Sequence, residues 1–210
     1  MGIQGSVIAS LSAGSNTVTL PEAGLTIVGL LTNVIYITIP IDSSRIAVFP
    51  TMPHNSDIGS ATALMRRVTW KVNGTSLNVT SVGSGTAVFY YGSPLPNSKK
   101  LTDFAGIYGS VSLSAATTGT ITMTFPSGNL NLTGMSGAFS SSEGYVEYQW
   151  NTSSGQEFTA FVVDNPVIDE SGRDILPMEL KVSQTVTVNV TSGASVTDTV
   201  YCFMFYQYVA

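Results

Sequence analysis

The stretch from Thr197 to Val209, TDTVYCFMFYQYV, decides the fold class because both of its alternating faces are apolar. Successive side chains of a β-strand point to opposite faces. A strand buried on one face alternates apolar with polar residues, whereas a strand buried on both faces does not. The sequence therefore predicts a final strand that packs on a core with one face and needs cover for the other. The two faces are Val200, Cys202, Met204, Tyr206 and Tyr208, and Tyr201, Phe203, Phe205, Gln207 and Val209.

Two turn signals upstream predict antiparallel pairing. A small polar loop follows Leu180–Thr191 and predicts a long hairpin with the final strand. Asn73-Gly74 separates Val68–Val72 from Thr75–Val82, and Asn-Gly is typical of the type I′ turn of a tight hairpin. We therefore expect these strands to pair with their neighbours in sequence.

The rest of the chain repeats the same pattern of short β-branched and aromatic runs between Gly, Pro, Asn and Ser. The uncharged run Ala23–Ile41 is long enough to span a bilayer, but its β-branched residues favour two buried strands. A short helix is expected only near Ser60–Arg67, and Gly134–Ser142 is interpreted as a loop or a flexible strand edge. Without a visible linker or internal repeat, we expect one all-β domain, an antiparallel β-sandwich, over residues 1–210. The other expected strands are Thr17–Leu20, Leu25–Leu31, Val34–Ile39, Arg45–Phe49, Thr86–Tyr91, Ile107–Ser114, Thr120–Phe125, Tyr145–Asn151 and Phe158–Asp164.

Charge is scarce for a chain that is not disordered. Charged residues make up 10% of the 210 residues, whereas about 25% is usual, and the mean hydropathy is +0.27. The net charge of −5 disfavours direct binding of nucleic acid, which depends on Lys and Arg. Cys202 is the only cysteine, so no disulfide within the chain is available.

Catalytic signatures are weak. His54 is the only histidine and has no nucleophile motif beside it. Glu143 and Glu147 fall on one face of a predicted strand beside aromatic residues, as in a sugar-binding groove, and Glu157 or Glu179 would have to supply the second carboxyl of a glycosidase. A solvated strand face is the simpler interpretation. We expect no enzyme and no cofactor.

A cluster of carboxylates in the loop VDNPVIDESGRDILP leaves a calcium site open. Its spacing does not follow a known calcium loop, so a polar loop in which Arg173 pairs locally is the favoured interpretation, and no metal is expected. The carboxylates are Asp164, Asp169, Glu170 and Asp174.

Asn-Xaa-Ser/Thr sequons are candidate glycosylation sites. Four of them are Asn78, Asn131, Asn151 and Asn189, and a fifth, at Asn73 in the predicted tight turn, is the weakest acceptor.

The uncovered face of the final strand predicts an assembly surface. Large apolar patches usually mark interfaces. If two Phe and a Tyr stayed exposed to water, the protein would lose several kcal/mol of stabilisation from apolar burial, at about 25 cal/mol per Å². The partner that fits a charge-poor chain of this kind is another copy of itself. The candidate interface residues are Tyr201, Phe203, Phe205, Tyr206 and Tyr208.

A charge-poor, Ser/Thr/Val-rich β chain whose start has no signal-peptide pattern and whose last strand is aromatic resembles the single jelly-roll major capsid proteins of icosahedral DNA viruses of archaea and thermophilic bacteria, such as portogloboviruses and sphaerolipoviruses. The resemblance implies a jelly roll of about eight core strands, a place in the virion, and pentamers or hexamers, with a paralogous second capsid protein. It leaves contact with an internal membrane or a nucleoprotein open. No functional residue is implied.

Two alternatives stay open. The first is a secreted surface-filament subunit that assembles by donor-strand exchange at the cell surface. The second is a β-sandwich glycoside hydrolase or carbohydrate-binding module.

Overall fold

The protein consists of two compact units in a computed structural model that describes residues 2–50, 66–139, 145–151, 157–163, 176–181, 185–192 and 197–209. In its described part, unit 1 comprises residues 2–50 and 66–105, and unit 2 comprises the residues from Gly106 onward.

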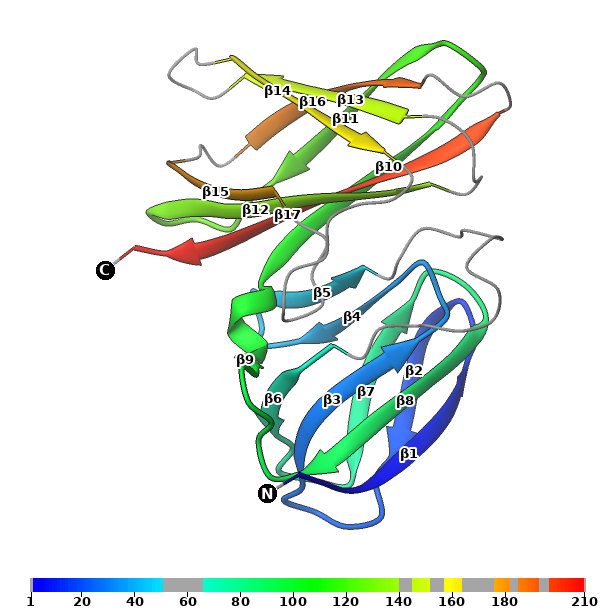
Figure 1. The fold of residues 1–210 in the computed structure, drawn as a ribbon, viewed down its shortest axis with the longest axis vertical. Helices are drawn as coiled ribbons and strands as arrows, with labels where there is room; N and C mark the ends of the chain where they lie inside the picture. The colour runs from blue at the N-terminus through cyan, green and yellow to red at the C-terminus, as the bar shows by residue number, and fades with distance from the viewer. Residues whose placement is uncertain are drawn as a thin grey trace. The chain divides into compact units, whose positions relative to one another are not determined.

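Unit 1 is a sandwich of two sheets (Figure 1). A 3₁₀ helix, η1 (Leu101–Phe104), ends the unit. All strand pairs are antiparallel except β6 with β9. The first sheet has the order β1 (Ile3–Leu11), β8 (Gly85–Gly92), β3 (Thr26–Thr32), β6 (Val68–Lys71) and β9 (Lys99–Lys100), and the second has the order β2 (Gly14–Thr19), β7 (Ser76–Ser81), β4 (Tyr36–Pro40) and β5 (Ile46–Pro50).

The core of unit 1 follows from the alternation of its strands. In β7, buried Leu77 and Val79 alternate with exposed Ser76 and Asn78. Both sheets contribute side chains that are almost completely buried, and η1 closes the core through Phe104, whose ring centroid lies 4.7 Å from that of Phe49. The buried set includes Ile27, Leu30, Ile37, Phe49, Val68 and Phe89.

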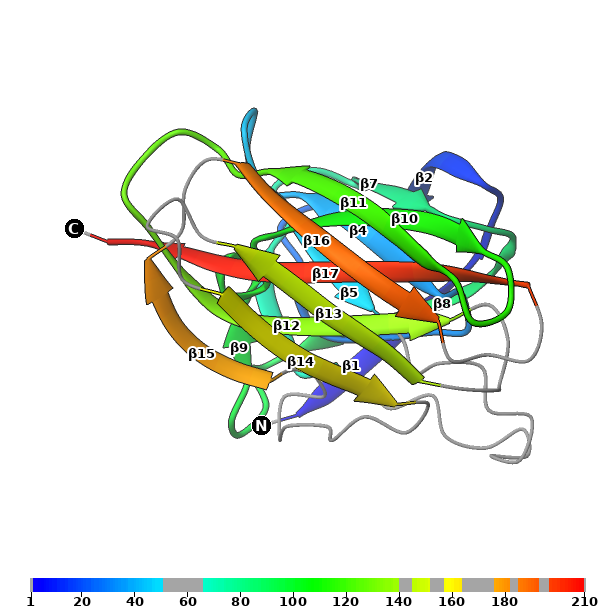
Figure 2. The same ribbon diagram turned by 90° about the horizontal axis from the view of Figure 1, so that it is seen from above.

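Unit 2 is a second sandwich, and Figure 2 shows one of its sheets crossing in front of the other. Its strand pairs are all antiparallel. The two sheets have the orders β10 (Gly106–Leu113), β17 (Asp198–Tyr208), β12 (Leu130–Phe139) and β15 (Leu176–Lys181), and β11 (Thr118–Thr124), β16 (Thr185–Ser192), β13 (Tyr145–Asn151) and β14 (Glu157–Val163).

Both units have the strand order of a jelly roll, in which eight strands form two four-stranded sheets. Numbered within its unit, each has the sheets first-eighth-third-sixth and second-seventh-fourth-fifth, and unit 1 adds β9 at one edge. The predicted all-β antiparallel sandwich is confirmed. The prediction of one jelly roll over residues 1–210 is corrected, because the same eight strands occur twice, each time around a separate core.

The repetition is also present in the sequence. Gly5-Ser6-Val7 of β1 matches Gly109-Ser110-Val111 of β10, and Ser10-Leu11-Ser12-Ala13 matches Ser112-Leu113-Ser114-Ala115 after it. The third strand of each unit carries a bulge at the same place, between Ile27 and Gly29 in β3 and between Leu132 and Gly134 in β12. Bulges are retained within families because they set the twist and aim of a strand. The two units are therefore a tandem repeat, contrary to the expectation that none is present.

The two predicted hairpins are wrong, although their strands are present. β6 and β7 lie in different sheets, as do β16 and β17. Neither Asn73 nor Gly74 has the positive φ that a type I′ turn requires. Each strand instead packs its apolar side on the opposite sheet, so burial over the whole unit outweighs the local turn preference.

Most of the other expected strands match the structure, but Leu180–Thr191, which was expected to be one strand, covers the end of β15 and most of β16, which lie in different sheets. The run Ala23–Ile41 forms β3 and β4, and no helix of the described residues is long and apolar enough to cross a membrane. Residues 134–139, which were expected to be a loop or a strand edge, belong to β12, an inner strand between β17 and β15. β1 was missed because Gly, Ser and Gln interrupt its apolar residues. The helix expected at Ser60–Arg67 lies largely outside the described residues.

Candidate functional site

The candidate interface residues of the final strand are mostly buried within the chain. β17 is an inner strand between β10 and β12. Phe203 and Phe205 have no exposed surface and Tyr206 is 1% exposed, while Tyr201 is half-buried. This corrects the expectation that sister copies must cover these aromatic side chains. Of the five candidates only Tyr208, which is 44% exposed and packs edge-on against Tyr206, belongs to the exposed class.

One face of β17 packs on the facing sheet of unit 2. Cys202 lies beside Gly109 in the register, and a Cβ on Gly109 would lie 2.4 Å from Cγ2 of Ile121 in β11. Tyr206 on the same face packs edge-on against Phe125, with ring centroids 5.7 Å apart. Burial raises the pKa of the Cys202 thiol far above its ordinary value, because the thiolate would lose its hydration. Cys202 is therefore an inert core residue.

Four edge strands form the most distinctive surfaces of the two units. Among the described residues, β1 pairs only with β8 and β2 only with β7 in unit 1, while β10 pairs only with β17 and β11 only with β16 in unit 2. None of the four contains a charged residue or a proline. Edge strands present unpaired N–H and C=O groups and are usually protected by Lys, Pro or a similar device. No described strand pairs with the outer edge of any of these four strands, and none of the four carries the usual protection.

The opposite edges of the four sheets do carry such protection. β9 consists of Lys99 and Lys100, β15 contains Pro177, and β14 begins at Glu157. β5 ends at Pro50. Each unit thus has one protected side and one unprotected side, and the unprotected side is formed by its first two strands.

The unprotected edges also expose apolar side chains. Ile8 in the middle of β1 is 73% exposed, and Tyr108 in β10 is 39% exposed. The neighbouring exposed positions are small and polar, such as Ser6 in β1 and Ser110 in β10. These edges can approach another strand closely without a charge clash.

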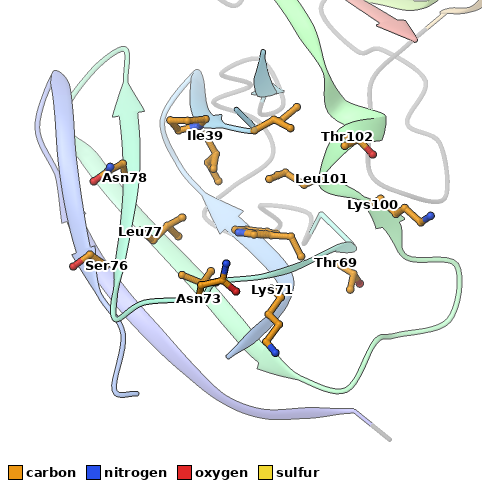
Figure 3. Close-up of a pocket in the computed structure, with 14 residues that line it drawn as sticks. Ile39, Thr69, Lys71, Asn73, Ser76, Leu77, Asn78, Lys100, Leu101 and Thr102 are labelled. Carbon is orange, nitrogen blue, oxygen red and sulfur yellow. The ribbon is translucent and has the colours of Figure 1, made fainter. Parts of the chain in front are cut away.

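A groove of about 510 Å³ opens in unit 1 (Figure 3). Leu77 and Leu101 point toward each other into it, while Lys71 and Lys100 point away. The described residues that line it include Ile39, Trp70 and Val72 but no carboxylate, histidine or cysteine. The groove offers apolar contact and no acid–base pair.

An ion pair between Arg45 and Asp42 is local. Arg45 Nε donates to Asp42 Oδ2 at 2.6 Å in the turn between β4 and β5. The Arg45 side chain, followed by the Ser44 backbone N–H, holds the pKa of Asp42 well below its usual range. The pair shapes an exposed turn and contains no reactive group.

Several residues singled out in the sequence cannot be placed. His54, Glu143 and the loop with Asp164, Asp169, Glu170 and Asp174 lie outside the described residues. Glu147, Glu157 and Glu179 lie in β13, β14 and β15, of which only the strand path is described. Within the described part of the chain no group of His, Cys, Asp or Glu is arranged to hold a metal ion.

The sequons differ in their surroundings. Asn78 and Asn189 are exposed on β7 and β16, Asn131 is half-buried on β12, and Asn73 is exposed before β7. Asn151 ends β13, where side chains are not described.

The unprotected edges were not anticipated from the sequence, although the absence of charge from residues 104–142 is visible there.

No family model and no curated protein matches the chain. Solved structures to which it is similar include a β-porphyranase of glycoside hydrolase family 86 from Bacteroides plebeius, with 13% identity and a TM-score of 0.22 over 98% of this chain and 36% of that one. The chain thus spans about a third of that enzyme's length.

Two further similar structures come from viruses. The infectious bursal disease virus Gt strain shares 12% identity at a TM-score of 0.24, over 98% of this chain and 76% of that one. The stem and receptor binding domain of the spike protein P1 from bacteriophage PM2 shares 9% identity at a TM-score of 0.18, over 99% and 98%. TM-scores this low assign no role to the chain.

Proposed function

We propose that this protein is a structural subunit of a virion, a major capsid protein whose copies associate side by side into a closed icosahedral shell. The observation that carries the proposal is the unprotected, uncharged side formed by the first two strands of each jelly roll. Because the unit is repeated, each chain presents such a side twice, and contact with sister copies would satisfy the open backbone groups.

The remaining surface agrees with a structural role. The described residues converge on no catalytic or metal-binding group, and the groove of unit 1 has no acid–base pair. We therefore propose that the protein acts by assembly and not by catalysis. Pentamers or hexamers, with or without a second paralogous protein, are the capsomers that the proposal entails.

Electron microscopy of the purified protein at increasing concentration tests the proposal. Closed shells are the expected result. Fibres would instead favour the donor-strand filament subunit, and a stable monomer at high concentration would overturn both forms of assembly.

Edge variants connect the assembly to the strands. Ser6 in β1 and Ser110 in β10 are exposed and equivalent, and a Lys at either position restores the usual protection of an edge strand. We expect Ser6→Lys with Ser110→Lys to abolish shells while the melting temperature stays unchanged. Thr187→Lys is the matched control, because Thr187 is exposed on the inner strand β16. Unchanged assembly of the double variant would refute the role of the edges.

A further inference from the structure

The same sequon occurs at the same place in both jelly rolls. Asn78-Val79-Thr80-Ser81 lies in β7, the seventh strand of unit 1, and Asn189-Val190-Thr191-Ser192 lies in β16, the seventh strand of unit 2. The registers agree as well, because Asn78 is paired with Thr17 of β2 and Asn189 with Thr120 of β11. The two asparagines are therefore structurally equivalent.

Packing does not explain why both units have this sequence. Asn78 is exposed between buried Leu77 and Val79, and Asn189 is exposed between buried Val188 and Val190. In Figure 3, Asn78 lies on the face of β7 opposite Leu77, and both residues are among those that line the groove. Only the central Val is required by the core. The flanking Asn and Thr lie on the other face, where Thr191 Oγ1 pairs with Thr118 Oγ1 at 3.1 Å in unit 2.

Both asparagines are exposed residues. Oδ1 of Asn189 accepts a hydrogen bond from Thr120 Oγ1 at 3.4 Å, and no described residue is hydrogen-bonded to its Nδ2. Within the described residues, no hydrogen bond engages the side chain of Asn78, whose backbone belongs to the β2–β7 ladder. Residues i and i+2 of a strand share a face, so the hydroxyl groups of Thr80 and Thr191 lie beside these amides. This is the arrangement of side chains that an Asn-Xaa-Thr acceptor supplies.

The other sequons lack this repetition. Asn131 is half-buried in β12, and its equivalent in unit 1 is Thr26, given that Leu25 matches Leu130 and Gly29 matches Gly134. Asn73 lies beside β7 and has no counterpart sequon in unit 2. Of the four sequons whose side chains the structure describes, only Asn78 and Asn189 are both exposed and repeated.

We infer that Asn78 and Asn189 are N-glycosylation sites, so that each jelly roll carries one glycan on the outer face of its second sheet. The donor is a lipid-pyrophosphate-linked oligosaccharide. The anomeric carbon of its first sugar forms a bond to Nδ2 while its bond to the pyrophosphate oxygen breaks, the lipid pyrophosphate leaves, and Nδ2 loses one proton to solvent. The inference does not depend on whether the copies form a shell.

Mass spectrometry of the protein isolated from the organism that produces it tests the inference. The expected result is a glycan mass on the peptides that contain Asn78 and Asn189, and none on the peptide with Asn131. Unmodified Asn78 and Asn189 in the native protein would overturn it, and so would modification of Asn131 alone.

Matched substitutions, expressed in the same organism, separate the sequon from the surface itself. Thr80→Ser keeps the acceptor sequence and is expected to keep the glycan, whereas the isosteric Thr80→Val removes the hydroxyl and is expected to lose one glycan mass. Thr191→Ser and Thr191→Val should behave in the same way at Asn189. Loss of the glycan with Thr80→Ser as well, or its retention with Thr80→Val, would contradict sequon-directed attachment.

Discussion

Gly109 shows how closely the sheets of unit 2 approach each other. A Cβ at this position would lie 2.4 Å from Cγ2 of Ile121 and 3.3 Å from Cγ of Met123. The glycine is needed for the space that it leaves and not for an unusual backbone conformation, because its φ is not positive. Its sequence context in a strand does not reveal this, since the facing residue belongs to another sheet.

Gly109→Val is expected to destabilise the protein by about 1–3 kcal/mol, because the added side chain overpacks the core against Ile121. Urea unfolding of the variant measures this. Gly74→Ala is the control, since the nearest atom to its Cβ would be 3.9 Å away. Equal free energies of unfolding for the two variants would show that the two sheets of unit 2 can move apart to accept the valine without loss of stability.

A second prediction at the residue scale concerns the pKa of the Asp42 carboxyl. Its pKa in the folded protein is lowered mainly by Arg45, so the ion pair contributes stability above the ordinary pKa of Asp, about 3.9, and the contribution is lost as the pH falls toward the folded value. Arg45→Gln should raise the pKa of Asp42 toward its ordinary value in an NMR titration. Arg67→Gln, far along the sequence, should leave it unchanged, and an identical titration curve in both variants would refute the pairing.

At the scale of elements, the alternation of apolar and polar residues predicted the strands well, whereas the turn residues did not predict which strands pair. β7, β8, β10 and β17 were expected within one or two residues of where they lie, because the period of two records which side chains are buried. The hairpin at Asn73-Gly74 failed because a jelly roll sends consecutive strands to opposite sheets. Which strand pairs with which depends on the whole unit and is not encoded in a two-residue turn.

The position of Cys202 in β17 predicts how its thiol reacts in the folded protein. Cys202 is completely buried in an inner strand and its pKa is strongly raised by burial, so a thiol reagent should not react with the folded protein at neutral pH. Addition of denaturant should start the reaction with one thiol per chain. Rapid labelling of the native protein would mean that β17 detaches from its neighbours far more easily than an inner strand should.

At the scale of the whole molecule, the duplication was the feature that the sequence concealed. The matching segments are short and their separation along the chain changes, from Gly5 and Gly109 to Asn78 and Asn189, so no fixed period appears. The retained bulge and the identical sheet order became visible only once strand pairing was known. The candidate glycosylation sites were in the sequence, but their equivalence was not.

Two separate cores predict that the units lose structure in separate steps. Phe89 is fully buried in the core of unit 1, and Phe89→Ala is expected to cost about 3–5 kcal/mol. In this variant, hydrogen exchange of β3 and β8 should accelerate at a urea concentration that leaves the Cys202 thiol unreactive. Simultaneous loss of both signals would show that the chain unfolds as one cooperative body.

The bulge retained in β3 and β12 has a consequence for the strands beside it. In β8, Tyr91 and Tyr90 pair with Ile27 and Gly29 on either side of the bulge, and in β17, Tyr206 and Phe205 pair with Leu132 and Gly134. Each unit therefore sets two neighbouring aromatic residues of its eighth strand opposite the extra residue, so both ladders depart from regular pairing at the same point.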